Sequence, residues 1–140
     1  MKYSTKASFF TNLRIMRPTN KYQEVTDFYV KGLGLKILNE FSNHDGYDGR
    51  MIGLPNEEYH LEIIYRHTDE PNVCLDKDNG LVFFCENEAS YIEIVNRLKS
   101  MGYPTCPAKN PWWNNHKGAH IEDPDGWPVI FYPTNQEVDF

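Results

Sequence analysis

Residues 13–34, LRIMRPTNKYQEVTDFYVKGLG, align without a gap on residues 81–102, LVFFCENEASYIEIVNRLKSMG. At this offset of 68 residues (81 − 13), apolar residues mostly fall on apolar residues, and YHLEII at 59–64 likewise falls on WPVIFY at 127–132. The identical pairs are few: Leu13 and Leu81, Lys31 and Lys99, Gly34 and Gly102. The shared order of apolar segments is therefore the stronger signal, and it indicates a duplicated structural unit.

The first copy reads as strand, helix and three strands. Residues 9–16 alternate loosely and predict a strand that ends at Pro18. Thr19 or Asn20 can cap a helix that stops near Gly32. Further strands are expected at 35–41, 51–54 and 59–65, separated by the turn-rich stretches HDGYDG (44–49) and LPNEE (54–58).

The second copy repeats that order. A strand is expected at 81–85, then a helix capped by Asn87 that ends at Gly102, and strands near 104–106, 119–122 and 127–132. A polar linker (67–79) separates module 1 (about 9–66) from module 2 (about 80–133), within one domain at 9–136. We predict an α+β fold of two βαβββ modules.

Size and composition favour a compact water-soluble protein. The chain has 140 residues, of which 40% are hydrophobic and 14% aromatic, so two modules of this length must share one core. No apolar run approaches the roughly 20 residues that cross a bilayer, and MKYSTKASFF at residues 1–10 lacks the apolar stretch of a signal peptide. We expect a cytoplasmic protein with no membrane partner.

Charge and cysteine content exclude some functions. The net charge of −6 argues against a nucleic-acid partner, which demands clustered Lys and Arg, and it favours a cationic ligand if the charge is functional. Cys74, Cys85 and Cys106 are too few and too irregularly spaced for a disulfide framework or a paired-cysteine metal site.

Several short segments together resemble one superfamily. These are DFY (27–29) followed by GLGL (32–35), LEII (61–64), MGY (101–103) and EDPDGW (122–127). In this order they resemble the vicinal oxygen chelate superfamily of glyoxalase I, extradiol dioxygenases, and fosfomycin and bleomycin resistance proteins. The resemblance covers about residues 9–133. It implies that the two modules form a curved mixed sheet around a ligand cleft and that the protein is a homodimer.

The resemblance also implies four metal positions, one on the first and one on the fourth strand of each module. In this chain they fall at Asn12, Glu62, Gly80 and Ile130. Divalent metals need His or carboxylate donors, and of the four only Glu62 is one. The alignment of the first strand is uncertain by two residues around 17–19, so Arg14 is an alternative to Asn12 for the first position. Arg is no better than Asn as a metal ligand. We therefore expect neither a bound metal nor any other cofactor.

Polar residues near these positions are candidate site residues. His60 and Glu62 share one strand face and can act as an acid and base pair or as a metal fragment, or be structural. Arg14 can bind a ligand carboxylate or phosphate, or instead neutralise Glu62.

The loop KNPWWNNHKG (109–118) places Trp112 and Trp113 in a polar, turn-prone stretch. They can form a lid over a planar or cationic ligand, or plug one end of the sheet or a subunit interface. Tyr47 has the same two interpretations. The other histidines lie singly on a strand (His120) or in loops (His44, His67, His116) and are weaker candidates.

Two functional hypotheses follow from the resemblance. The first is a metal-independent small-molecule binding protein of the bleomycin-resistance type, which would give antibiotic resistance by sequestering a ligand in a cleft lined by Arg14, His60, Glu62 and Trp112 or Trp113. The alternative is a glyoxalase-like lyase, isomerase or dioxygenase with a divalent metal at a rearranged site around His60 and Glu62, which needs a further donor such as His116 or His120. A third possibility is a closed cleft with only a dimer surface in use.

Overall fold

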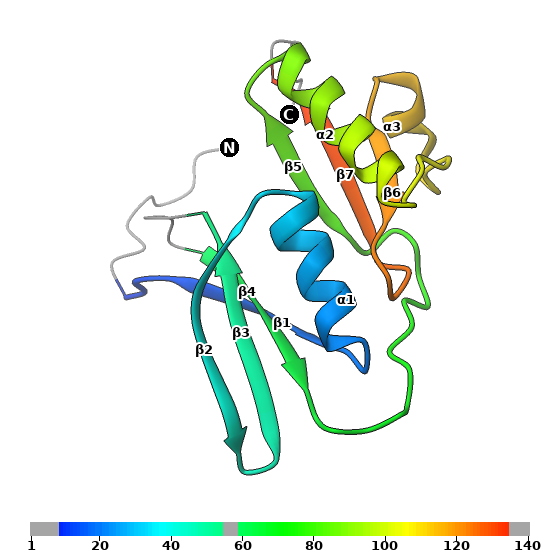
Figure 1. The fold of residues 1–140 in the computed structure, drawn as a ribbon. Coiled ribbons are helices and arrows are strands. Elements are labelled where there is room, and N and C mark those ends of the chain that lie inside the picture. Colours follow the sequence, from blue (N-terminus) through cyan, green and yellow to red (C-terminus); the bar gives the residue numbers. More distant parts are fainter. Residues whose placement is uncertain (1–8, 55–58, 135–140) are drawn as a thin grey trace.

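The structure, a computed structural model, describes residues 9–54 and 59–134 (Figure 1). The turn expected at 54–58 and the domain end at 136 lie largely outside these residues. The first module contains β1 (Leu13–Pro18), α1 (Tyr22–Asp27), η1 (Phe28–Gly32), β2 (Lys36–His44), β3 (Tyr47–Gly53) and β4 (Tyr59–Tyr65). The second contains β5 (Leu81–Cys85), α2 (Glu88–Ser100), α3 (Pro111–Asn115), β6 (Ala119–Glu122) and β7 (Pro128–Pro133). The predicted α+β class is confirmed.

The two modules build their sheets on the same plan. In the first sheet the strand order is β1-β4-β3-β2, and in the second it is β5-β7-β6. The first strand of each module pairs parallel with the last, β1 with β4 and β5 with β7. In both modules, therefore, the two strands expected to carry site residues are neighbours.

One predicted strand of the second module is reduced to a single bridge. Cys106 makes an isolated antiparallel bridge with His120, where the sequence predicts a strand at 104–106. Pro104 and Pro107 flank Cys106 and cannot donate a backbone hydrogen bond, so the pairing does not extend.

Several element boundaries differ from prediction, including the end of β2, which runs to His44 rather than to residue 41. β1 begins at Leu13 rather than at residue 9 and includes Pro18, which an edge strand tolerates. β3 begins at Tyr47 rather than 51, because the turn is confined to Asp45 and Gly46, with φ of 53° and 89° as a tight hairpin requires. The Trp loop, expected to be irregular, forms α3, where Pro111 is the first residue and the Asn110 side chain accepts from the Trp112 amide.

The two long helices differ in how they begin. The Asn87 side chain accepts a hydrogen bond from the Ser90 amide at 2.8 Å, so the predicted cap of α2 is confirmed. The predicted cap of α1 is wrong: its N-cap is Lys21, which has no side-chain cap bond. The Thr19 hydroxyl instead accepts from the Lys21 amide in a local turn.

One core joins the modules. In Figure 1 α2 lies in front of β5 and β7, and a Cβ on Gly32 of η1 would lie 2.6 Å from Leu98 Cδ2 of α2, so η1 and α2 approach closely there. The buried cluster draws on both halves of the chain: Val25, Phe28, Tyr29, Leu35, Ile52, Leu61, Ile63, Leu98, Ala119, Ile121, Val129 and Phe131. No described helix has the length and apolar character needed to span a bilayer.

A buried ion pair also connects the modules. Arg17 on β1 donates to Asp123 Oδ2 at 2.7 Å, and the same oxygen accepts from the Tyr29 hydroxyl at 2.7 Å. The Arg17 guanidinium lies 4.4 Å from the centre of the Trp127 ring. Burial alone lowers the pKa of Arg17, but attraction to Tyr29 and Asp123 outweighs it and leaves the pKa raised. The Asp-Pro-Asp-Gly turn is thus an attachment point for the first module.

Candidate functional site

Arg14, His60 and Glu62 form a hydrogen-bonded cluster on one face of the β1–β4 pair. Arg14 Nε donates to His60 Nε2 at 3.0 Å, and Nη1 donates to Glu62 Oε2 at 2.9 Å. The Arg14 side chain is 47% exposed, whereas that of Glu62 is only 9% exposed. Arg14 therefore neutralises Glu62, one of its two predicted roles, and still presents a cation to solvent.

The strand register decides which residue of β1 corresponds to Gly80. Met16 lies opposite Glu62, and Val82 lies opposite Ile130. Because Gly80 precedes Val82 by two residues, its counterpart precedes Met16 by two residues and is Arg14. Asn12 is exposed and lies before β1. The register thus favours Arg14 over Asn12 for the first position, the option that the sequence left open.

The residues at these four positions do not fit a divalent metal. Gly80 is packed against the backbone: a Cβ there would lie 2.6 Å from the Pro128 carbonyl oxygen, so a larger side chain requires the strand to shift. Ile130 has no donor, and His60 Nε2 and Glu62 Oε2 already accept hydrogen bonds from Arg14. Across residues 9–54 and 59–134 there is no group of three or more His, Cys, Asp or Glu side chains arranged to hold a metal ion.

The second module has a cavity on its corresponding face. It has a volume of about 550 Å³. Apolar walls come from strands β5 and β7 and from α3, and polar groups stand around them. The lining residues are Lys77, Asp78, Asn79, Gly80, Val82, Ala108, Lys109, Asn110, Pro111, Trp113, His120, Pro128 and Ile130. Polar and apolar groups thus share this lining, and a small organic molecule with both kinds of surface fits such a cavity.

His120 is the buried titratable group of this cavity. It is 3% exposed, and its Nδ1 lies 3.1 Å from Cys106 Sγ. Burial lowers the pKa of His120 and raises that of the Cys106 thiol, so both side chains are neutral near pH 7. His120 Nε2 has no hydrogen-bond partner among the described residues. The sequence ranked His120 low because its bridge to Cys106 was not visible there.

The two tryptophans of α3 divide the roles predicted for them. Trp113 lines the cavity. Trp112 stacks on His116 with ring centroids 4.1 Å apart. Both tryptophans contact the Tyr132 ring, with centroid distances of 6.0 Å for Trp112 and 5.9 Å for Trp113. A Cβ on Gly118 would lie 2.8 Å from the Trp113 ring, so this glycine lets Trp113 lie flat against the chain. Trp113 is thus placed to contact a ligand, and Trp112 covers one end of the sheet.

A second cavity of about 320 Å³ lies between the modules. Its lining is mostly apolar and includes Ile15 and His60 from the first module and Val82 from the second. Val82 also lines the larger cavity. The second cavity therefore lies between the Arg14 cluster and the larger cavity.

Tyr47 lies apart from these groups. It begins β3 at the β2–β3 hairpin, whereas Met51 is the β3 residue opposite Glu62. Four residues of extended strand separate Tyr47 from Met51, about 13 Å. The structure does not bring Tyr47 to the cluster, while it reveals Lys77, Lys109 and Val82 as lining residues that carry no sequence motif.

The fold and its neighbours define the class of protein. The chain has the fold of the vicinal oxygen chelate superfamily, as the sequence resemblance predicts. A trypanothione-dependent glyoxalase I from Leishmania major matches with a TM-score of 0.67 and 18% identity over 87% of this chain and 85% of that one. TnmS3, an antibiotic-binding protein from a Streptomyces species, matches with a TM-score of 0.65 and 19% identity over 93% of this chain and 98% of that one.

Within that superfamily the chain belongs to the YycE-like family. Residues 13–64 match the YycE-like N-terminal domain, and residues 78–133 match the YycE-like C-terminal domain. The uncharacterized protein YycE of Bacillus subtilis is 44% identical over 119 residues, 85% of each chain. A crystal structure of YycE, of unknown function and grouped with glyoxalases and fosfomycin resistance proteins, matches with a TM-score of 0.82, 42% identity and 92% coverage of both chains.

Proposed function

We propose that this protein binds a small organic molecule without a metal ion and sequesters it in the cavities between and within its modules. The observation that carries the proposal is that the family's metal-donor positions hold other side chains. Arg14 occupies the first-strand position of module 1. Gly80 and Ile130 occupy the corresponding positions of module 2 and form part of a cavity wall. The likeness to an antibiotic-binding protein of the same fold supports a sequestering role.

A direct test measures binding of the neutral fluorophore N-phenyl-1-naphthylamine together with metal content. We expect saturable binding that Trp113→Ala weakens about tenfold, because an aromatic wall of the cavity is lost. Trp112→Ala is the matched control and should have a smaller effect, since Trp112 packs on His116 and Tyr132. Equal effects of the two variants would contradict the proposed cavity.

The enzyme alternative requires a metal bound around His60 and Glu62. Because a metal held only by the native state raises stability, melting curves with Mn²⁺, Fe²⁺, Ni²⁺ and Zn²⁺ separate the two functions. We expect the four metal ions to change the melting temperature only slightly and by the same amount. If the protein binds one metal ion per chain and Glu62→Ala abolishes that binding, the lyase or dioxygenase hypothesis replaces the binding proposal.

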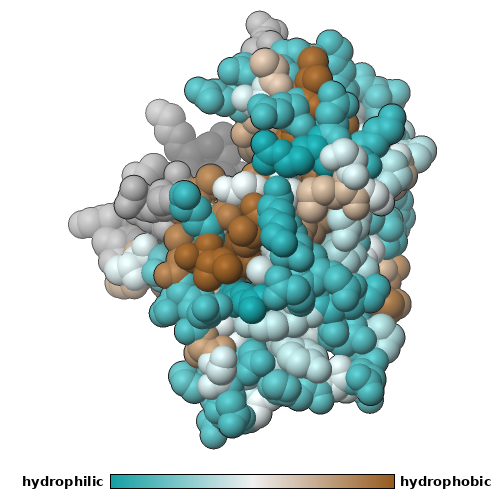
Figure 2. Space-filling view, in the orientation of Figure 1, coloured by the Kyte–Doolittle hydropathy of each residue, from teal (hydrophilic) through white to brown (hydrophobic). Residues whose placement is uncertain are grey.

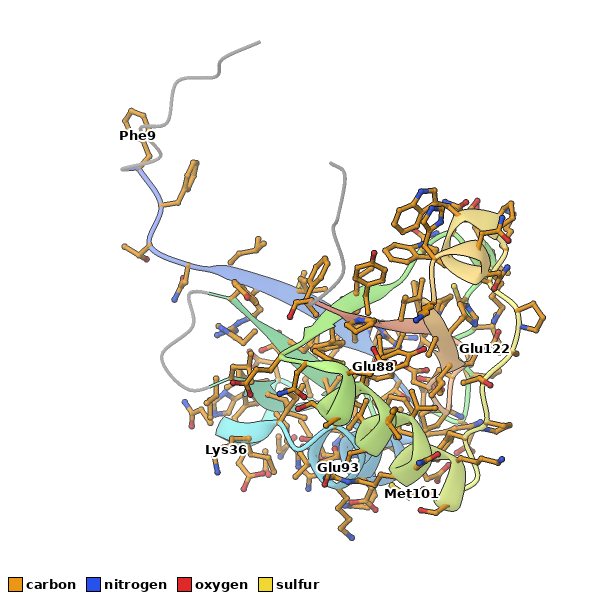
Figure 3. The ribbon with its side chains drawn as sticks, turned by 90° about the horizontal axis from the view of Figure 1, so that it is seen from above. Phe9, Lys36, Glu88, Glu93, Met101 and Glu122 are labelled. Carbon is orange, nitrogen blue, oxygen red and sulfur yellow. The ribbon has the colours of Figure 1, made fainter. Side chains whose placement is uncertain are left out.

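We also propose that the protein is a homodimer in which a second copy covers the β1 edge. In the described residues β1 pairs only with β4, and Leu13 and Met16 on it are 62% and 66% exposed. Phe9 and Phe10, 88% and 79% exposed, lie on the segment before β1, and Figure 3 shows Phe9 standing away from the body. Figure 2 shows exposed apolar surface gathered into a patch on one side of the molecule.

A second copy is the proposed occupant of this edge, because the superfamily resemblance implies a homodimer. The exposed apolar side chains before and along the edge are Phe9, Phe10, Leu13 and Met16. Light scattering should give a mass near twice 16.4 kDa.

Charge reversal locates the interface. Phe10→Glu combined with Leu13→Glu should give monomers at micromolar concentration, because carboxylates would be buried against apolar surface. Leu75→Glu is the matched control, since Leu75 is 93% exposed in the linker. A wild-type monomer, or a dimer that survives the double substitution, would contradict this interface.

A further inference from the structure

The charge that the Arg14 cluster presents to a ligand is positive. Glu62 is 9% exposed and lies beneath Arg14, whose side chain is 47% exposed. A molecule that approaches this face therefore meets the guanidinium before the carboxylate. The acidic composition of the whole chain suggests a cationic ligand, but the exposed guanidinium favours an anionic one. The guanidinium decides, because a contact at a few ångströms outweighs a dispersed surface charge that salt screens.

Arg14 also has hydrogen-bond donors to spare. A guanidinium carries five N–H groups in a rigid fork. Nε donates to His60 and Nη1 donates to Glu62, while Nη2 makes no hydrogen bond within the described residues. Two acceptors already fix the orientation of the fork, so little further side-chain entropy is lost when a ligand oxygen binds to Nη2.

An apolar cavity lies next to this donor. His60, which accepts a hydrogen bond from Arg14 Nε, lines the 320 Å³ cavity between the modules. Ile15 also lines it, although alternation along β1 places Ile15 and Arg14 on opposite faces of the strand. A ligand with its apolar body in this cavity reaches Arg14 by extending a substituent past His60.

We propose that the ligand carries an anionic oxygen group, a carboxylate or a sulfonate- or phosphonate-like group, which binds Arg14 while an apolar ring system occupies the inter-module cavity. This inference rests on the proposed binding function and specifies its ligand class. The Arg14 cation, held by Glu62 and His60, takes the electrostatic place that a divalent metal has in the chelating members of the superfamily.

Three fluorophores that share a naphthylamine ring test the charge preference. They are anionic 8-anilinonaphthalene-1-sulfonate, neutral N-phenyl-1-naphthylamine and cationic N-(1-naphthyl)ethylenediamine. We expect the anion to bind the wild type more tightly than the neutral compound, and Arg14→Gln to weaken the anion about tenfold, the loss of one charge-assisted hydrogen bond. The neutral compound should bind Arg14→Gln as it binds the wild type, which also shows that the variant is folded.

Two further variants make the test specific. Arg66→Gln is the matched control, because Arg66 is 58% exposed and paired with Glu70, yet lies at the far end of β4 from His60. It should leave all three affinities unchanged. Glu62→Gln should tighten binding of the anion severalfold, since it frees the charge of Arg14, whereas a site for cations would respond in the opposite direction.

The outcomes separate this inference from the binding function. If the neutral compound binds but the anion has no advantage, or if Arg14→Gln weakens both equally, the anionic preference is wrong and the binding function stands. Weaker anion binding by Glu62→Gln would overturn it in the same way. If no fluorophore binds the wild type, both proposals fail.

Discussion

The two modules share a strand frame but differ in the residues on their site-facing surfaces. On that surface module 1 has Arg14, His60 and Glu62 joined by hydrogen bonds. By register and repeat, module 2 has Gly80, Pro128 and Ile130 there, against a cavity of about 550 Å³. One scaffold thus supports a charged cluster in one half and, at the corresponding positions of the other half, the apolar wall of a cavity.

The helix-facing surfaces explain why the frame survives this difference. Leu61 and Ile63 of β4, and Val129 and Phe131 of β7, alternate with the site-facing residues and belong to one buried core. Packing against α1 and α2 fixes these side chains, because interiors tolerate little change in volume. The opposite faces lie outside this shared core and carry different side chains in the two modules.

The largest expected effect comes from breaking the connection between the modules. Arg17→Leu should lower the free energy of unfolding by about 3–5 kcal/mol, because it leaves the Asp123 carboxylate buried without its cation. Arg66→Leu, which removes an exposed pair with Glu70, should cost less than about 1 kcal/mol. Urea unfolding of the two variants measures the difference; equal losses would mean that Arg17 does not join the modules.

Gly80 and Arg14 occupy equivalent positions in the two modules, and alanine should destabilise the protein by different amounts at the two positions. Gly80→Ala should cost about 1–3 kcal/mol, because its Cβ would meet the Pro128 carbonyl at 2.6 Å. Arg14→Ala, despite removing far more atoms, should cost no more than about 1 kcal/mol, since its ion pair is half exposed. A larger loss for Arg14→Ala in urea unfolding would reverse this order and show that the polar cluster stabilises the fold.

The smallest effect is a pH dependence in module 2. Burial lowers the pKa of His120 below its ordinary value of 6.5, while Glu122 and Lys77 nearby partly offset each other. His120 therefore binds a proton more readily in the unfolded chain than in the folded protein. The stability that neutral His120 contributes is fully present above pH 6.5 and is lost as the pH falls below that value. Between pH 7.5 and pH 5.5, the free energy of unfolding of His120→Gln should fall less than that of the wild type. His116→Gln, at an exposed position, should lose as much as the wild type.

Local signals predicted most elements well. β4 and β5 have the predicted bounds, and the Asn87 cap of α2 forms as expected. Errors arose where neighbours overrode local pattern: pairing with β2 and β4 extended β3 back to Tyr47, and the prolines beside Cys106 limited a predicted strand to one bridge. No local pattern contains these long-range effects.

The sequence also named the Arg14, His60 and Glu62 group, because period-two alternation places residues of one strand on a common face. It could not decide between Asn12 and Arg14, nor could it find the cavity lined by Lys77, Lys109, Val82 and His120. These residues come from separate segments that only the folded chain brings together.

Apolar periodicity, the repeat and the turn residues determined the fold class and the two-module plan by themselves, because those signals act over a few residues or one strand. Tertiary structure alone decided the register of β1 on β4, the fit of Gly80 against Pro128 and the exposure of Arg14 above Glu62. The reason is that register and burial depend on contacts between strands distant in sequence, and these contacts determine which charge faces the ligand.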